Sequence, residues 1–163
     1  MTWRRTALAV AAVLALLAAL PIVAFGVVPL FVRSTLHESP PPLPEPTAAS
    51  PSASSPVTEP AAPARSGALR RIDAVHYGSG RVILSGGSLR FEEVDIAGAP
   101  NMFVYLSDRT DGQPGQYVDL GALRATNGSF NYMLPPNLEP SSVRSVVVWC
   151  RAFSVTVTYA VLG

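Results

Sequence analysis

The feature that most constrains this chain is the stretch 7–32, which carries no charged side chain and is apolar except at Pro21, Gly26 and Pro29. As one helix it would rise about 39 Å at ~1.5 Å per residue, which exceeds the roughly 30 Å hydrocarbon core of a bilayer. The stretch therefore predicts one N-terminal transmembrane helix, embedded in the lipid bilayer through residues 7–32, within an anchor segment 1–33.

The basic residues around this stretch indicate its orientation. Arg4 and Arg5 precede it, and Arg33 alone follows it closely. The positive-inside rule then predicts a single-pass cell-membrane protein with a cytoplasmic N-terminus and an extracytoplasmic C-terminal domain. The alternative is a cleaved secretory signal, whose apolar region is usually roughly 7–15 residues long. Both interpretations export the rest of the chain.

Residues 34–66 have a different composition, rich in Pro, Ala and Ser, and hold most of the chain's 16 prolines. Such a segment buries too little apolar surface to offset the entropy lost on ordering. We expect a disordered, partly polyproline linker that holds a domain away from the membrane. The rival interpretation, a docking motif for a Pro-recognising partner, lacks a distinctive proline spacing.

Residues 67–163 contain short apolar and aromatic runs separated by Gly, Asn, Pro and Asp, and no convincing helical period. This pattern is typical of a β-sandwich. We expect an all-β domain, an antiparallel and jelly-roll-like β-sandwich. In chain order, the expected strands are 81–85, 89–95, 102–106, 117–120, 129–134, 146–150 and 153–161. Asn127-Gly128 predicts a turn before the strand 129–134.

The last two expected strands differ in pattern. Residues 146–150 are apolar on both faces, as in a central strand. From Phe153 on, alternation predicts that Phe153, Val155, Val157, Tyr159 and Val161 face the core. Arg151 would share this face, and a bend or bulge near 151–152 would resolve the conflict. For the same reason, the alternation of side chains does not decide whether Cys150 faces the core.

Charge and composition exclude several function classes. The domain 67–163 carries eight Arg and eight acidic residues, and such a neutral surface disfavours nucleic-acid binding. Cys150 is the single cysteine, so an intrachain disulfide or a four-cysteine metal site cannot form. The chain has no Lys, and His76 is the one histidine of the domain. This thin acid–base inventory does not favour an enzyme, and no metal-ion site is predicted.

Several short motifs follow one another along the domain. They are His76-Tyr77-Gly78-Ser79-Gly80, Ala99-Pro100 before Phe103-Val104-Tyr105-Leu106-Ser107, Leu120-Gly121-x-Leu123, Gly128, Tyr132-x-Leu134-Pro135, Val148-Trp149-Cys150-Arg151-x-Phe153 and Ala160-x-Leu162. In this order and spacing the sequence resembles the electron-transfer DM-13 (DM13) domain family over about 90 residues. It departs from the family pattern at Ala99, where Gly is usual, and at Val157 and Thr158, where Phe and Gly are common.

The resemblance implies an extracytoplasmic β-domain of the kind often attached to cytochrome-type or other redox modules. It implies Cys150 as a candidate redox thiol or haem ligand. Trp149 and His76 are the other candidate haem-binding residues. Because the chain carries no redox module of its own, electron transfer would require a separate redox partner protein or a bound cofactor, for which haem is the candidate.

Each of these residues also has a structural interpretation. Cys150 can be a small buried hydrophobe in a Val-rich strand, Trp149 a core anchor, and His76 an ordinary loop residue. Two functional hypotheses follow. The first is a membrane-tethered redox or electron-transfer accessory module that uses Cys150. The alternative is a non-catalytic cell-surface binding or adhesion β-sandwich with a purely structural cysteine.

Overall fold

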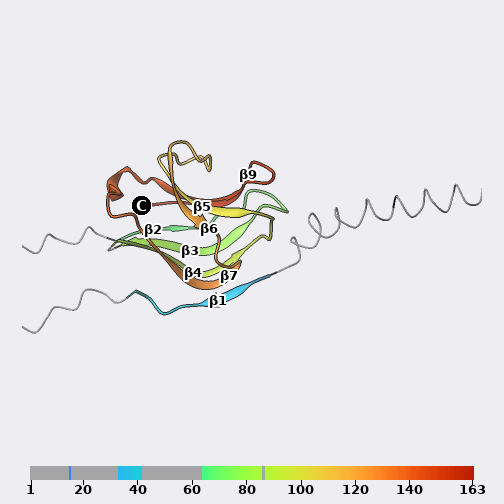
Figure 1. The fold of residues 1–163 in the computed structure, drawn as a ribbon, viewed down its shortest axis with the longest axis horizontal. Helices are drawn as coiled ribbons and strands as arrows, with labels where there is room; N and C mark the ends of the chain where they lie inside the picture. The colour runs from blue at the N-terminus through green and yellow to red at the C-terminus, as the bar shows by residue number, and fades with distance from the viewer. Residues whose placement is uncertain (1–14, 16–32, 42–63, 86) are drawn as a thin grey trace, which may run out of the picture.

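The computed structural model describes Ala15 and residues 33–41, 64–85 and 87–163. The strands between Thr35 and Val161 form two β-sheets packed face to face (Figure 1). The strands are β1 (Thr35–His37), β2 (Arg65–Ala68), β3 (Gly78–Ser85), β4 (Ser88–Ile96), β5 (Met102–Ser107), β6 (Tyr117–Ala122), β7 (Asn127–Met133), β8 (Ser145–Cys150) and β9 (Val155–Val161). A single 3-10 turn, Pro140–Ser142, precedes β8. The prediction of an all-β sandwich is confirmed for this part of the chain.

The first sheet has five strands in the order β1-β7-β4-β3-β2. β2, β3 and β4 form an antiparallel meander, and β7 adds to β4. β1 pairs with β7 in parallel, with Thr35 opposite Asn127. The sheet is therefore mixed, which corrects the expectation of a purely antiparallel sandwich. The consecutive pairing of β2, β3 and β4 also differs from the jelly-roll-like strand connectivity that we expected.

The second sheet has the order β6-β5-β8-β9 and is antiparallel throughout. β8 lies inside this sheet, as its two apolar faces predicted. The two sheets are joined along one edge, where the backbones of Ser66 and Gly163 exchange two hydrogen bonds of 3.2 and 3.0 Å. The Arg65 guanidinium donates to the carbonyls of Pro140, Val143 and Leu162 and fastens the same edge.

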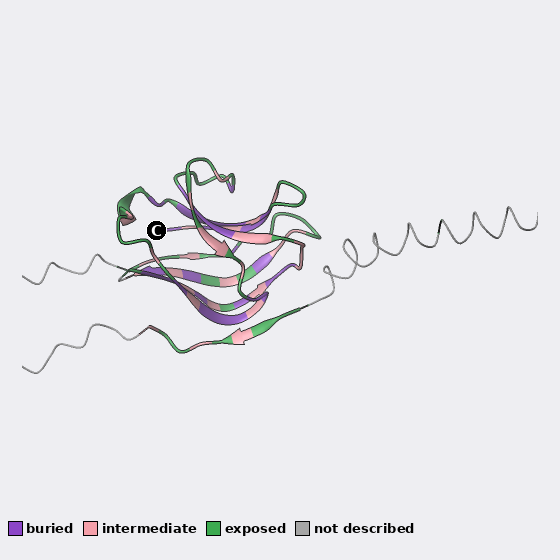
Figure 2. Cartoon of the chain, in the orientation of Figure 1, coloured by how far each residue is buried: buried purple, intermediate pink, exposed green. Residues whose placement is uncertain are grey.

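The core lies between the sheets, and the strands of both sheets contain buried residues (Figure 2). Phe91 and Phe130 stack at a centroid distance of 5.0 Å, and Tyr132 meets both rings edge-on. The strand residues of the second sheet complete the core with Val, Leu, Ala and Cys side chains. Burial of these apolar side chains is the main stabilising contribution to a domain of this size.

Two β-bulges change which side chains face the core. In β4 the register shifts between Phe91 and Val94, with Glu93 at a φ of 49°, so Val94 turns inward where strict alternation placed it outside. In β9 Val157 has no opposite partner, because Val148 pairs with Thr158 and Trp149 with Thr156. A bulge shifts the parity of every later residue.

The predicted core face of the last strand is therefore wrong beyond Val157. Thr158 is fully buried, and Ala160 and Leu162 follow it into the core. Tyr159, predicted to face the core, instead lines a surface groove. Phe153 is 61% exposed in the turn between β8 and β9.

Two local expectations concern turns. Residues 151–154 form a turn between β8 and β9, at the place where we expected a bend or bulge. Asn127 and Gly128 are the first residues of β7 and not a turn before it. Gly128 is needed there because β1 lies against it: a Cβ at Gly128 would come within 2.1 Å of the Leu36 carbonyl oxygen.

The stretch 34–66 was expected to be disordered, but its described ends belong to the first sheet. β1 and the start of β2 lie within it, so disorder does not hold at 34–41 or 64–66. Residues 42–63 lie outside the described residues, as does the expected transmembrane stretch 7–32 apart from Ala15. Among the residues that the structure describes, no helix is long and apolar enough to cross a bilayer.

Candidate functional site

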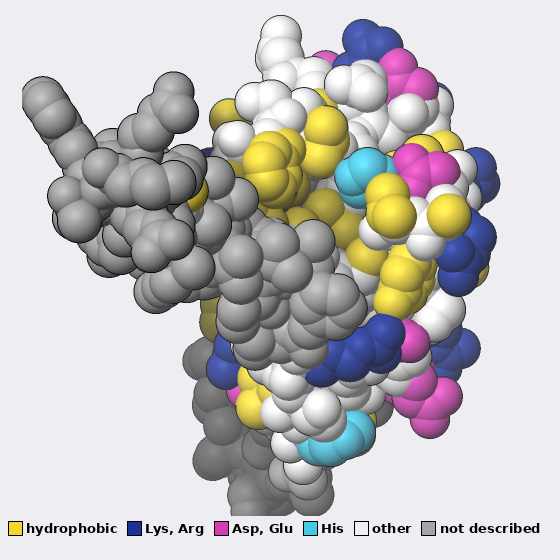
Figure 3. Space-filling view, turned by 90° about the vertical axis from the view of Figure 1, so that its right-hand side faces the viewer, with side chains coloured by type: hydrophobic (Ala, Val, Ile, Leu, Met, Phe, Trp, Pro, Cys, Tyr) yellow, Lys and Arg dark blue, Asp and Glu magenta, His cyan; other side chains and the backbone are white. Residues whose placement is uncertain are grey.

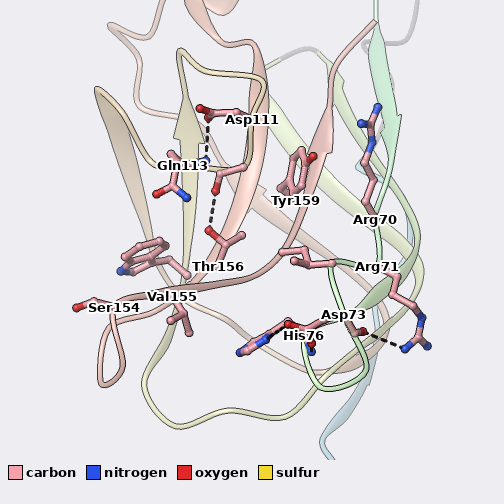
Figure 4. A pocket seen from close by; sticks show the side chains of 13 residues that line it. Arg70, Arg71, Asp73, His76, Asp111, Gln113, Ser154, Val155, Thr156 and Tyr159 are labelled. Atoms are coloured by element: carbon pink, nitrogen blue, oxygen red, sulfur yellow. Dashed lines mark hydrogen bonds and ion pairs between the residues drawn. The ribbon is translucent and has the colours of Figure 1, made fainter.

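A groove of about 720 Å³ lies at the edge of the second sheet and is the main candidate site (Figure 4). Three segments far apart in the sequence form its walls: the loop between β2 and β3, the loop between β5 and β6, and the strands β8 and β9 with their turn. The lining residues are Arg70, Arg71, Ile72, Asp73, His76, Asp111, Gly112, Gln113, Trp149, Ser154, Val155, Thr156 and Tyr159. Its volume is in the usual range for small-molecule and cofactor sites.

The wall formed by the β2–β3 loop is fastened to β9 by backbone contacts. The Arg70 N–H donates to the Tyr159 carbonyl at 3.0 Å, and the buried Thr158 hydroxyl donates to the Arg70 carbonyl at 2.8 Å. Gly78 leaves room for Thr158, since a Cβ there would lie 2.5 Å from its hydroxyl. The bulge at Val157 thus has a local consequence, because it turns Thr158 inward to hold the loop.

The opposite wall is fixed in a similar way. The Thr156 hydroxyl donates to the Gly112 carbonyl at 2.6 Å. A Cβ at Gly112 would come within 2.8 Å of the Tyr159 ring, so the loop packs closely on this ring. Asp111 accepts the Gln113 backbone N–H at 3.1 Å and pairs with Arg109, which together with that bond lowers the pKa of Asp111 to about 2.

His76 lies at one end of the groove and is paired with Asp73 (Figure 4). The ring Nδ1 is 2.7 Å from Asp73 Oδ2, while Oδ1 accepts the backbone N–H groups of Val75 and His76. The side-chain hydrogen bond from His76, with these backbone bonds, lowers the pKa of Asp73 to about 2. This arrangement occupies Nδ1 and leaves Nε2 without a partner among the described side chains.

Aromatic rings and guanidinium groups line the rest of the groove. Trp149, half-buried on β8, lies opposite Thr156 and faces outward from the sheet. The Arg70 guanidinium lies 5.6 Å from the Tyr159 ring centroid, and that of Arg71 lies 4.7 Å from the Tyr77 ring centroid. The groove therefore offers flat apolar walls together with two cations, a combination suited to a planar anionic ligand.

Cys150 does not belong to this groove. Its side chain is fully buried among core residues, on the other face of β8 from Trp149. The Sγ atom donates a hydrogen bond to the Pro100 carbonyl at 3.1 Å. A reactive or metal-ligating sulfur must be accessible, and this one is enclosed. The structure therefore brings His76 and Trp149 together and separates both from Cys150.

Arg151, next in the chain, lies on the outer face of the second sheet, whereas alternation with Phe153 and Val155 would have placed it toward the core. Its guanidinium stacks 3.5 Å from the Phe103 ring centroid, donates to the Tyr105 hydroxyl at 2.7 Å, and pairs with Asp119. The hydrogen bond to Tyr105 and the pairing with Asp119 raise the pKa of Arg151. Arg151 therefore stabilises this face and does not contact the thiol.

The comparison with protein families agrees with the fold and the motifs. A model of the family described as electron transfer DM13 matches residues 72–162, more than half of the chain. The chain belongs to this family. The DM13 match covers every strand from β3 to β9 and most of the groove, and an electron-transfer domain is compatible with a redox partner. No curated protein and no solved structure matches the chain significantly.

Haem was the cofactor suggested by the resemblance, and the side chains of this DM13 domain can be tested against it. His76 fits, since metal-ligating histidines usually donate the second ring nitrogen to a carboxylate, as His76 does to Asp73. Arg70 and Arg71 supply cations for the haem carboxylates at the same groove. Cys150 does not fit, because it is enclosed in the core.

Sequence reasoning singled out His76 and Trp149 but missed most of the groove. Arg70, Arg71, Thr156 and Tyr159 carry no motif that marks a ligand site. Tyr159 was assigned to the core because the bulge at Val157 leaves no signal in the alternation. In the described residues no cluster of three or more His, Cys, Asp or Glu side chains could hold a metal ion.

Proposed function

We propose that this protein is a membrane-tethered, extracytoplasmic electron-transfer module whose redox group binds in the groove between His76 and Tyr159. Membership of the electron-transfer DM13 family supports a redox role. The apolar stretch 7–32 and the arginines around it support the tether and the export of the domain. The contact between His76 and Asp73 at the end of an aromatic, Arg-lined groove is the observation that carries the assignment.

In this proposal haem is held by side chains of the groove alone. His76 Nε2 would ligate the iron, with Asp73 orienting the imidazole through Nδ1. Arg70 and Arg71 would pair with the haem carboxylates, and Trp149 would pack on the ring system. Bound haem would supply one-electron exchange with a redox partner protein.

Hemin titration of the full-length protein in detergent tests this assignment. We expect a saturable shift of the haem Soret band that His76→Ala abolishes and Cys150→Ala retains. His37→Ala is the matched control, because His37 is the other histidine and lies exposed on β1, away from the groove. No saturable shift, or a shift lost in Cys150→Ala and kept in His76→Ala, would contradict the proposal.

A second candidate is a non-catalytic binding or adhesion module with a structural cysteine. The burial of Cys150 favours it, since a thiol packed in the core and donating to Pro100 acts as a small hydrophobe. The same titration separates the candidates. A binding module would give no haem spectrum in any variant, while an electron-transfer module would also show reversible reduction of the bound haem.

A further inference from the structure

The strand β1 places the start of the folded domain directly after the expected membrane anchor. Only Arg33 and Ser34 stand between the apolar stretch 7–32 and Thr35, the first residue of β1. An extended chain spans at most roughly 3.6 Å per residue, so Thr35 lies within about 11 Å of the end of that stretch. The two residues between the apolar stretch and β1 are therefore too few to hold the domain away from the bilayer.

Arg33 is itself part of the domain. Its guanidinium donates to Asp95 at 2.9 Å and to the Tyr77 hydroxyl at 2.8 Å. The Ser34 carbonyl accepts the backbone N–H groups of Thr126 and Asn127 at 3.1 and 2.9 Å. These contacts fix the chain against one end of the sandwich from its first described residues after the apolar stretch.

That end, here called the anchor-side end, comprises the loop 69–77, the turn 97–101 and the turn 151–154. Strand pairing places them together: Gly78 lies opposite Ile96, Asp95 opposite Asn127, and Cys150 opposite Met102. Met133, six residues along β7 from Asn127, lies at the far end. At about 3.4 Å per residue this places Met133 roughly 20 Å farther along the strand.

The anchor-side end exposes apolar side chains together with arginines. Ile72 is 47% exposed, Val75 69% and Phe153 61%. The guanidinium groups of Arg33 and Arg71 contact the Tyr77 side chain at the same end. Figure 3 looks onto this end, where apolar side chains gather beside a histidine and an acidic group. Aliphatic and aromatic side chains with arginines are the composition of surfaces that settle at the bilayer headgroup level.

We propose that the anchor-side end of the domain rests on the outer surface of the bilayer, with Ile72, Val75 and Phe153 at the headgroup level. The proposal rests on the tether included in the proposed function. The occupant of this surface is lipid, because the chain that enters the end at Arg33 comes directly from the apolar stretch 7–32. The groove, which shares the loop 69–77, then lies close to the membrane surface.

Fluorophore depth measurements on the full-length protein test this orientation. Val75→Cys and Met133→Cys, both at strongly exposed positions, are labelled with the polarity-sensitive dye NBD, and unmodified protein measures any signal from the buried Cys150. The proteins are reconstituted into phosphatidylcholine vesicles with or without doxyl-labelled lipid. Phe153→Cys provides a second anchor-side position in case the Val75 variant does not fold.

We expect NBD at positions 75 and 153 to emit at shorter wavelength and to lose at least half its fluorescence to doxyl lipid. NBD at position 133 should behave as in water. Water-like emission at all three positions in protein that floats with the vesicles would overturn the orientation and leave the tether intact. Quenching at position 133 would also overturn it. Protein that does not float would overturn both the orientation and the tether.

Discussion

Cys150 is the residue whose position most changes the functional interpretation. The family resemblance suggested that it is a redox thiol, and strand alternation did not decide whether its side chain faces the core. The structure encloses it in the core, with Sγ 3.1 Å from the Pro100 carbonyl oxygen. Access to the sulfur therefore requires opening of the sandwich, and the cost of opening a core strand approaches the global stability.

The reactivity of this thiol follows from its burial. We predict that Cys150 of the native protein reacts with Ellman's reagent on the order of a thousandfold more slowly than in denaturant, given a global stability of at least ~5 kcal/mol. Met133→Cys supplies an exposed thiol as the control in the same chain. A native Cys150 rate within tenfold of the control would show that the sulfur is accessible.

The ionisation of Asp73 makes the stability of the loop 69–77 depend on pH. Its folded pKa of about 2 lies below the ordinary value of 3.8, chiefly because His76 donates to it. A depressed pKa means that the ionised carboxylate stabilises the loop 69–77 above pH 3.8, and that this contribution is lost as the pH falls toward 2.

We predict that NMR titration of the Asp73 carboxyl carbon gives a midpoint near 2 and that His76→Ala raises it toward the ordinary value. His37→Ala should leave the midpoint unchanged. An Asp73 midpoint that is the same with and without the His76 imidazole would show that their contact does not form in solution.

At the scale of elements, the strands were largely predictable and their bulges were not. Short apolar and aromatic runs bounded by Gly, Asn, Pro and Asp located β3 to β9 to within a few residues, because buried strands alternate with such turns in a sandwich. The bulges at Glu93 and Val157 leave no comparable signal, since each adds one residue that pairs with nothing. The error at Tyr159 and Thr158 follows from the second bulge.

β1 was missed for a different reason. Thr35-Leu36-His37 is short and followed by prolines, so nothing in its own composition indicates a strand. It forms by pairing with β7, where Gly128 allows a close approach, and it continues through Glu38, which donates its N–H to the Ser129 carbonyl at 2.7 Å. Such long-range pairing is invisible to local pattern analysis.

Gly128→Ala tests this pairing. The new Cβ would meet the Leu36 carbonyl, so we predict that β1 separates from β7 and that the Glu38 amide loses its protection from hydrogen exchange. Gly121→Ala is the matched control, because Gly121 has a similar φ, 97° against 105°, but no neighbouring atom within 4 Å. We expect Gly128→Ala to lower the free energy of unfolding by about 1–2 kcal/mol more than the control. Equal losses would contradict the account of β1.

At the scale of the whole molecule, the chain enters the sandwich at the anchor-side end and leaves the described part at residue 41, at the far end. It returns at residue 64, again at the far end, where Arg65 lies opposite Leu84. The Pro-rich stretch 42–63 thus connects two strands of one sheet (Figure 1). Composition identified the stretch but could not reveal that both its ends are tied to the domain.

The groove was beyond sequence analysis for a related reason. Its walls come from residues 70–76, 111–113 and 149–159, and only the folded sheets bring these together. The family motifs pointed to the neighbourhood of Trp149 and Cys150, yet adjacent residues of a strand face opposite sides. The fold therefore assigns Trp149 and His76 to the groove and Cys150 to the core.

The central claim is that His76, and not Cys150, is the residue that meets the redox group. Electron paramagnetic resonance of the full-length protein loaded with ferric haem tests it most directly, because imidazole and thiolate ligation give different spectra. We predict an imidazole-ligated spectrum that is unchanged in Cys150→Ala and lost in His76→Ala. A thiolate-ligated spectrum that disappears in Cys150→Ala would contradict the account.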